Sequence, residues 1–171
     1  MDTLLAIASR RDERRTLPEP LAPELALRLL DAGRLSGSSR NSQPWTFVVP
    51  EGRARIEELA GAVFVPENVL HAGLVVAILV HGKGPVLFDA GRAAQSMLLA
   101  AWAEGIASCP NGIAEIDVAR GALDATDDET PVIVLSFGLP EKPRDPERQT
   151  AAEWSARANR KSIDEVVRWL P

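Results

Sequence analysis

The chain has 171 residues, of which 46% are hydrophobic and 25% are charged, and its formal net charge is −5. A chain of this length buries roughly 70% of its unfolded surface, so we expect one domain over 1–171 whose core needs no metal or disulfide. The acidic charge argues against a nucleic-acid binder, and no apolar run approaches the roughly 20 residues of a membrane helix. We therefore expect a cytoplasmic protein that binds neither nucleic acid nor a membrane. The single cysteine, Cys109, agrees with a reducing compartment.

Hydrophobic periodicity and turn residues predict a mixture of helices and strands. In chain order these are a helix over 2–9, an extended connector over 16–23, a helix over 23–33, a polar loop over 35–44, a strand over 45–49, a helix over 56–63, a strand over 74–80, a helix over 89–104 and a strand over 132–137. The strand over 74–80 is continuously apolar, which is typical of a strand covered on both faces.

The predicted helix over 89–104 is apolar on every face. Ala94, Met97 and Trp102 form one stripe, while Leu99 lies on the opposite face. A helix with this pattern is buried, either in the middle of a domain or at a subunit interface.

The C-terminal segment has a different composition. Residues 139–161 are polar and contain prolines, which indicates an extended arm without a core of its own. Such an arm can wrap a partner subunit or remain a flexible tail. Ser162 and Glu165 then form a capping-box pattern, which predicts a terminal helix over 162–170.

Several common catalytic motifs are missing. The sequence contains no G-x-x-x-x-G-K-[ST] loop, no G-x-G-x-x-G after a strand, no G-x-S-x-G and no H-E-x-x-H. Two histidines and one cysteine leave too few ligands for an ordinary zinc site, so we expect no metal. No nucleophile, acid or base stands at a telling spacing, so no catalytic side chain is assigned.

Three polar segments stand out. The first, over 10–15, places four arginines within six residues, which is either a solvated charge run or a phosphate-binding cluster. The second, over 38–45, is rich in side chains that both donate and accept hydrogen bonds. It is either a plain turn or a loop that reads the polar edge of a heteroaromatic ligand. The third is a basic cluster over 157–161. Together the three fit one phosphorylated planar ligand held without metal.

In this order the segments resemble the FMN-dependent nitroreductase family. The similar motifs are R-R-x-x-R at 10–14, S-S-x-N-x-Q-P-W-x-F-V-V at 38–49, A-A-Q-x-x-L-L-A-A at 93–101 followed by G-I-x-S-C-P, and N-R-K-S-I-D-E-V-V-x-W at 159–169. The resemblance implies an α+β fold with a mixed sheet flanked by helices. It also implies an intertwined homodimer with two FMN sites at the interface, where the helix over 89–104 and the C-terminal arm would contact the partner.

The resemblance assigns flavin contacts to three groups and no catalytic side chain, because the flavin carries the chemistry. The groups are Arg10, Arg11, Arg14, Arg160 and Lys161 for the phosphate, Ser38, Ser39, Asn41 and Gln43 reaching over from the other subunit, and the backbone of Pro110, Asn111 and Gly112 at the reactive edge. In the stretch over 64–68, where relatives often place polar flavin contacts, Asn68 is the obvious candidate.

The implied activity is an NAD(P)H-dependent oxidoreductase with a ping-pong mechanism. NAD(P)H would reduce FMN and leave, and a small acceptor such as a nitroaromatic or a quinone would then take the electrons. Two other interpretations stay open. The short chain fits a flavin or deazaflavin binding module without NAD(P)H turnover of its own. Asp12 and Glu13, two carboxylates beside the phosphate cluster, fit a non-redox interaction protein.

Overall fold

A computed structural model describes residues 1–170 and divides the chain into two compact units. The larger unit spans Arg11–Pro143, and the smaller one combines Met1–Arg10 with the segment from Arg144 onward. The sequence had predicted a single domain. Within residues 1–170, no helix is both long enough and apolar enough to span a membrane.

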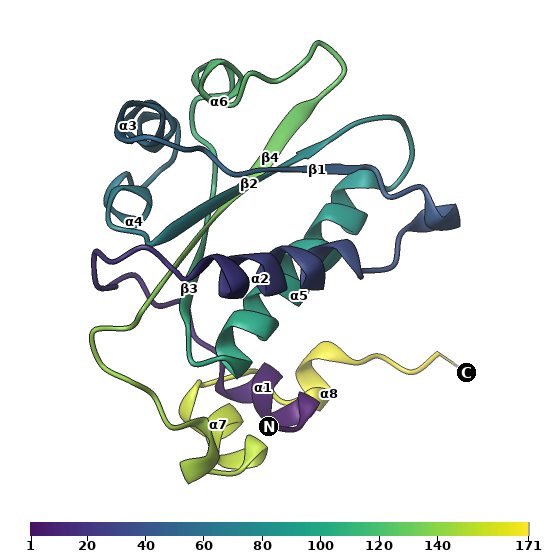
Figure 1. The fold of residues 1–171 in the computed structure, drawn as a ribbon. Helices are drawn as coiled ribbons and strands as arrows, with labels where there is room; N and C mark the ends of the chain where they lie inside the picture. Colours follow the sequence, from purple (N-terminus) through teal and green to yellow (C-terminus); the bar gives the residue numbers. More distant parts are fainter. Residues whose placement is uncertain (171) are drawn as a thin grey trace. The chain divides into compact units, whose positions relative to one another are not determined.

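The larger unit is built around a four-stranded sheet with the strand order β1-β2-β4-β3 (Figure 1). Its elements are α2 (Pro23–Arg34), the 3-10 turn η1 (Ser39–Asn41), β1 (Trp45–Val48), α3 (Arg53–Gly61), α4 (Glu67–Leu70), β2 (Leu74–Val80), α5 (Val86–Ala103), β3 (Ala107–Asn111), α6 (Ile116–Ala122) and β4 (Thr130–Gly138). All three strand pairs are antiparallel, so the α+β prediction is confirmed but the prediction of a mixed sheet is wrong. The mixed sheet was implied by the resemblance alone, and hydrophobic periodicity could not test it because it carries no information about strand direction.

Alternating side chains of β2 supply the cores on both faces of the sheet. Val76 and Ile78 pack with α2 and α5 in one apolar cluster, while Val75 and Leu79 pack with α3 and α6 in the other. Figure 1 shows these helix pairs on opposite sides of the sheet. The central strand is therefore covered on both faces, as its continuous apolar sequence predicts.

Strand β3 was not predicted, because its sequence Ala-Ser-Cys-Pro-Asn has neither alternation nor a β-branched residue. It forms because β4 offers its full edge, and Pro110 is tolerated because β3 is itself an edge strand. Helix α5 begins at Val86, three residues earlier than expected, and buries Met97 and Trp102. On its opposite face Leu99 is half-buried within this chain.

The smaller unit contains α1 (Thr3–Ser9), the 3-10 turn η2 (Pro146–Arg148), α7 (Ala151–Arg157) and α8 (Ile163–Val166). Helix α7 packs on α1 and buries Trp154, whose Nε1 donates to the Pro146 carbonyl oxygen at 2.8 Å. The guanidinium carbons of Arg148 and Arg157 lie 5.3 Å and 5.9 Å from the centroid of the indole ring. Residues of the predicted arm over 139–161 thus form a 3-10 turn and a helix, and Trp154 among them is buried.

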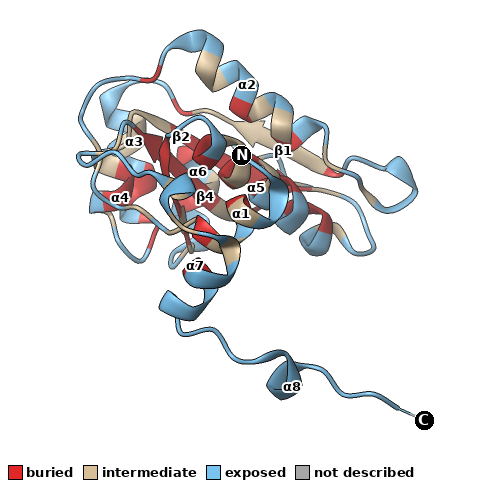
Figure 2. Ribbon diagram, turned by 90° about the horizontal axis from the view of Figure 1, so that it is seen from below, coloured by how far each residue is buried: buried red, intermediate tan, exposed pale blue. Residues whose placement is uncertain are grey.

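The capping box at Ser162 and Glu165 is present, but α8 ends at Val166 instead of continuing to residue 170. Val167 is extended, and residues 159–170 are exposed throughout (Figure 2). A cap without a packed face holds only one turn, because most helix stability in proteins comes from packing.

Candidate functional site

The arginine segment lies beside β3. The backbone N–H of Glu13 donates to the Ser108 carbonyl oxygen at 3.0 Å, so residues 11–14 run next to the strand that ends at Pro110–Gly112. Arg11 is half-buried and Arg14 is exposed. Two of the predicted phosphate ligands are therefore held near the predicted reactive-edge segment by a backbone contact.

The remaining predicted phosphate ligands belong to the smaller unit. Arg10 is half-buried there, while Arg160 and Lys161 are exposed. Asp12 is exposed and Glu13 is half-buried. Because guanidinium groups bind two oxygens at once, the arginine segment over 10–14 has side chains that can hold a phosphate without a metal ion. Within residues 1–170 no three His, Cys, Asp or Glu side chains gather as metal ligands would.

At the end of β3 the Asn111 side chain is turned into the protein. Asn111 is 4% exposed, and its Nδ2 donates to the Val134 carbonyl oxygen at 3.2 Å. The next residue, Gly112, accepts a hydrogen bond from the Phe64 N–H at 3.1 Å. A Cβ on Gly112 would lie 3.1 Å from the Phe64 ring, so a larger residue would require the ring to shift by a few tenths of an ångström. The Phe64 ring itself is 73% exposed.

The predicted loop over 38–43 is strained and tightly held. Arg40, Asn41 and Gln43 have φ angles of 53°, 55° and 48°, a region that non-glycine residues occupy at a cost. The Ser38 hydroxyl accepts from the Gln43 N–H at 2.8 Å, and the Ser39 N–H donates to Asp89 Oδ2 at 2.9 Å. Strained backbone that the surroundings hold in place is typical of ligand-binding loops.

Asp89 is a site residue that the sequence reasoning missed. It stands in the first turn of α5, is 1% exposed, and has its Oδ1 at 3.6 Å from Arg92 Nη1. The Arg92 guanidinium also fills the space beside Gly37, where a Cβ would collide with it. A buried carboxylate needs such partners, because leaving it unpaired is costly. Its only signal in the sequence was an acidic residue at the start of a mainly apolar helix.

The topology separates the two predicted flavin-contacting groups within one chain. The 38–43 loop enters β1, and Pro110–Gly112 leaves β3, so they lie at opposite edges of the sheet (Figure 1). Three strand spacings amount to about 14 Å across the sheet. Trp45 aligns through Val80 with Thr130, and Asn111 pairs with Val134, which adds about 13 Å along the strands.

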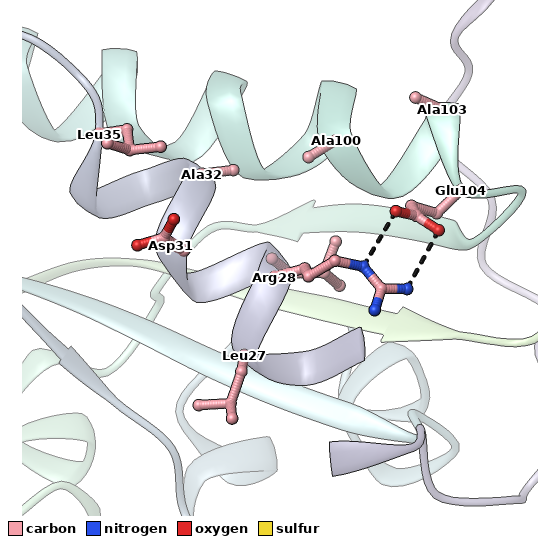
Figure 3. Close-up of a pocket in the computed structure, with 9 residues that line it drawn as sticks. Leu27, Arg28, Asp31, Ala32, Leu35, Ala100, Ala103 and Glu104 are labelled. Carbon is pink, nitrogen blue, oxygen red and sulfur yellow. Dashed lines mark hydrogen bonds and ion pairs between the residues drawn. The ribbon is translucent and has the colours of Figure 1, made fainter. Parts of the chain in front are cut away.

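A separate hollow lies on the outer face between α2 and α5 (Figure 3). It measures about 610 Å³ and is lined by Leu27, Leu35 and Ala100, with the Arg28–Glu104 ion pair at one end. The guanidinium contacts the carboxylate twice, at 3.1 Å and 3.2 Å. None of the predicted flavin ligands lines this hollow.

The shifted carboxyl pKa values belong to surface groups. Hydrogen bonds from Thr46 Oγ1, at 2.7 Å, and from the Thr126 N–H hold the pKa of Glu129 below its usual range. Glu129, Thr46 and Thr126 lie outside the candidate flavin site, so this pKa shift affects the stability of the fold and not the chemistry.

Comparison with known proteins identifies the family of this chain. The model of the nitroreductase family matches residues 7–76 and 85–139. A protein of Methanothermobacter thermautotrophicus, named for NADH dehydrogenase/NAD(P)H nitroreductase, is 27% identical over 90% of this chain and 88% of its own.

Two solved structures share the fold over nearly their full length. A nitroreductase family protein of Clostridium difficile has a TM-score of 0.82 at 23% identity, covering 99% of this chain and 98% of its own. A nitroreductase of Desulfovibrio desulfuricans in complex with FMN has a TM-score of 0.78 at 25% identity, covering 100% and 98%. With the family model matching most of the sequence, this chain belongs to the nitroreductase family.

Proposed function

We propose that this protein is an FMN-dependent oxidoreductase that takes electrons from NAD(P)H and delivers them to a nitroaromatic, a quinone or a similar small acceptor in a ping-pong sequence. The observation that carries the proposal is the Glu13–Ser108 backbone bond, which places an arginine segment beside β3. The names of the relatives, which include an NAD(P)H nitroreductase and an FMN complex, support it.

The residues present fit this cofactor. Arg11 and Arg14 offer guanidinium forks suited to a phosphate, and Pro110–Gly112 offers backbone groups next to them. The 38–43 loop offers hydroxyl and amide groups that both donate and accept, as the polar edge of an isoalloxazine requires. Bound FMN would supply the hydride chemistry, so the protein needs no acid, base or nucleophile of its own.

In this scheme the chain's own residues bind and orient. The arginines neutralise the phosphate, and the rigid end of β3 fixes which backbone groups face the ring. Asp89 keeps the strained loop in one conformation through the Ser39 N–H. The assignment of Arg10, Arg160 and Lys161 to the phosphate remains a prediction from the sequence resemblance.

We also propose a homodimer in which each flavin site combines the arginine segment and β3 of one chain with the 38–43 loop of the other. The separation of these groups within one chain supports a shared site. Exposed apolar side chains supply surface for a partner: Leu27 and Leu35 on α2, Leu87 and Phe88 on α5, and Trp169 near the C-terminus.

The experiment is FMN binding by Arg14→Ala and by Arg15→Ala, followed by NAD(P)H oxidation with a quinone acceptor. Arg15 is an exposed neighbour outside the assigned set and serves as the matched control. Loss of a charge-assisted hydrogen bond at Arg14 should weaken FMN binding by about 1.5–3 kcal/mol. An unchanged affinity would show that the phosphate is placed wrongly. FMN binding without NAD(P)H oxidation would favour a flavin-binding module.

A further inference from the structure

We infer that Asn68 is a positioning residue for the Pro110–Gly112 backbone and acts through the buried side chain of Asn111. The inference rests on the proposed flavin site. It replaces the expectation that the Asn68 amide contacts the flavin directly.

The carboxamide of Asn111 is the centre of a buried hydrogen-bond network. Its Nδ2 lies 3.1 Å from the Cys109 carbonyl oxygen, 3.2 Å from the Val134 carbonyl oxygen and 3.1 Å from Ser136 Oγ. The Ser136 hydroxyl also donates to the Cys109 carbonyl oxygen, at 3.2 Å. The network therefore joins the last residues of β3 to two positions of β4.

This network fixes the orientation of both asparagine side chains. Two carbonyl oxygens surround Asn111 Nδ2, so that atom must be the donor, and Oδ1 must face the other way. Asn68 Nδ2 meets that Oδ1 at 2.9 Å and has Cys109 Sγ at 4.0 Å on its other side. The Asn68 donor group is thus directed into the protein.

Asn68 belongs to a segment that contacts two successive residues at the end of β3. The Phe64 N–H donates to the Gly112 carbonyl oxygen, and the Asn68 side chain donates to Asn111. One contact comes from the backbone and the other from a side chain. The segment over 64–68 therefore contacts both Asn111, through its side chain, and Gly112, through its carbonyl oxygen.

Both asparagine side chains are buried, so the loss of their hydrogen bond is costly. Asn68 is 8% exposed and Asn111 is 4% exposed, so removing one partner leaves a buried polar group without its bond. Without the Asn68 donor, Asn111 Oδ1 would lack its hydrogen bond, and the segment over 64–68 would lose its side-chain contact with the end of β3. The backbone at Asn111 and Gly112 would then be held less firmly. Groups that face a reacting centre work best when they are held in place before the reaction.

The test compares Asn68→Ala and Asn68→Asp with Val69→Ala. Asn68→Asp keeps the shape of the side chain but puts an acceptor where Asn111 Oδ1 needs a donor, so both Asn68 variants should show the same defect. Val69 is fully buried on the same short helix and carries no polar group. Its truncation measures the effect of merely loosening α4.

With FMN bound, both Asn68 variants should shift the flavin reduction potential and slow single-turnover flavin reduction by about tenfold or more, because misplacement of positioning groups is that costly. Their FMN dissociation constants should stay within about threefold of the wild type, because the phosphate contacts are intact. Val69→Ala should lower stability without shifting the potential. A wild-type potential and rate in the Asn68 variants, or the same shift in Val69→Ala, would overturn the inference.

A second measurement needs no flavin. In the protein without added FMN, amide hydrogen exchange at Asn111 and Gly112 should be about tenfold faster or more in both Asn68 variants, beyond any change in global stability. Unchanged exchange would refute the positioning role. A wild-type protein that binds no FMN would instead refute the proposed function, and the exchange result would still decide the role of Asn68.

Discussion

The proposed site predicts that two defective variants should complement each other when they form a mixed dimer. In one variant, Arg14→Ala removes a proposed phosphate ligand beside β3. In the other, Ser39→Ala with Asn41→Gly removes polar side chains of the loop, and glycine suits the φ of 55° at position 41. If each site takes its two halves from different chains, a heterodimer of the variants contains one intact site and one doubly defective site.

The size of the effect follows from the topology and from simple mixing. The two halves lie about 14 Å apart across the sheet and about 13 Å apart along it, so one chain does not bring them together. Random exchange of equal amounts makes half of the dimers mixed, and half of their sites are intact, so about a quarter of the wild-type sites should return. The assay is FMN binding and NAD(P)H oxidation after subunit exchange.

A matched mixture controls for nonspecific effects of mixing. Arg14→Ala combined with Arg11→Ala alters the same half of the site twice, so this pair should show no recovery. Activity of the first mixture that equals the average of its two components would refute the shared site. It would mean that each chain builds its site alone.

Three further predictions concern the contact that holds the 38–43 loop and the stability of the larger unit. Asp89→Ala removes the acceptor of the Ser39 N–H, so urea unfolding should show a loss of about 1.5–3 kcal/mol, and FMN binding should weaken; unchanged unfolding would count against the clamp. Gly73→Ala would press a Cβ against the Glu19 carbonyl oxygen, and should cost about 1–3 kcal/mol in the same assay, whereas a wild-type midpoint would show that the backbone yields freely. The pKa of Glu129 is lowered in the folded state, so its contribution is present above about pH 4.5 and is lost as the pH falls through the folded pKa. Glu129→Gln should therefore remove stability at pH 7, by no more than about 1 kcal/mol because the group is partly exposed, and this loss should shrink as the pH falls through the folded pKa; a loss that does not change with pH would contradict this.

The sequence was informative where burial imposes a pattern. The continuous apolar run of β2 and the proline that starts α2 both predicted elements that the structure contains. Strand β3 gave no such pattern, because its pairing depends on the edge of β4, which lies far away in the sequence. Strand direction was also beyond reach, since it depends on how the connections run and not on periodicity.

The sequence likewise predicted only part of the candidate site. Residue types predicted the polar loop and the arginine segment, because these side chains suit a phosphorylated planar ligand. They did not predict Asp89, whose role comes from a contact with Ser39 fifty positions away. Asn68 was noticed for its polarity, but only the structure shows its amide turned toward Asn111.

The measurement that tests the central claim most directly is the visible absorption spectrum of the purified protein after addition of FMN and removal of the excess, together with its mass in solution. The proposed function predicts a flavin spectrum with about one FMN per chain on a species of two chains. A colourless protein would contradict the cofactor. A single chain that retains FMN would contradict the shared site.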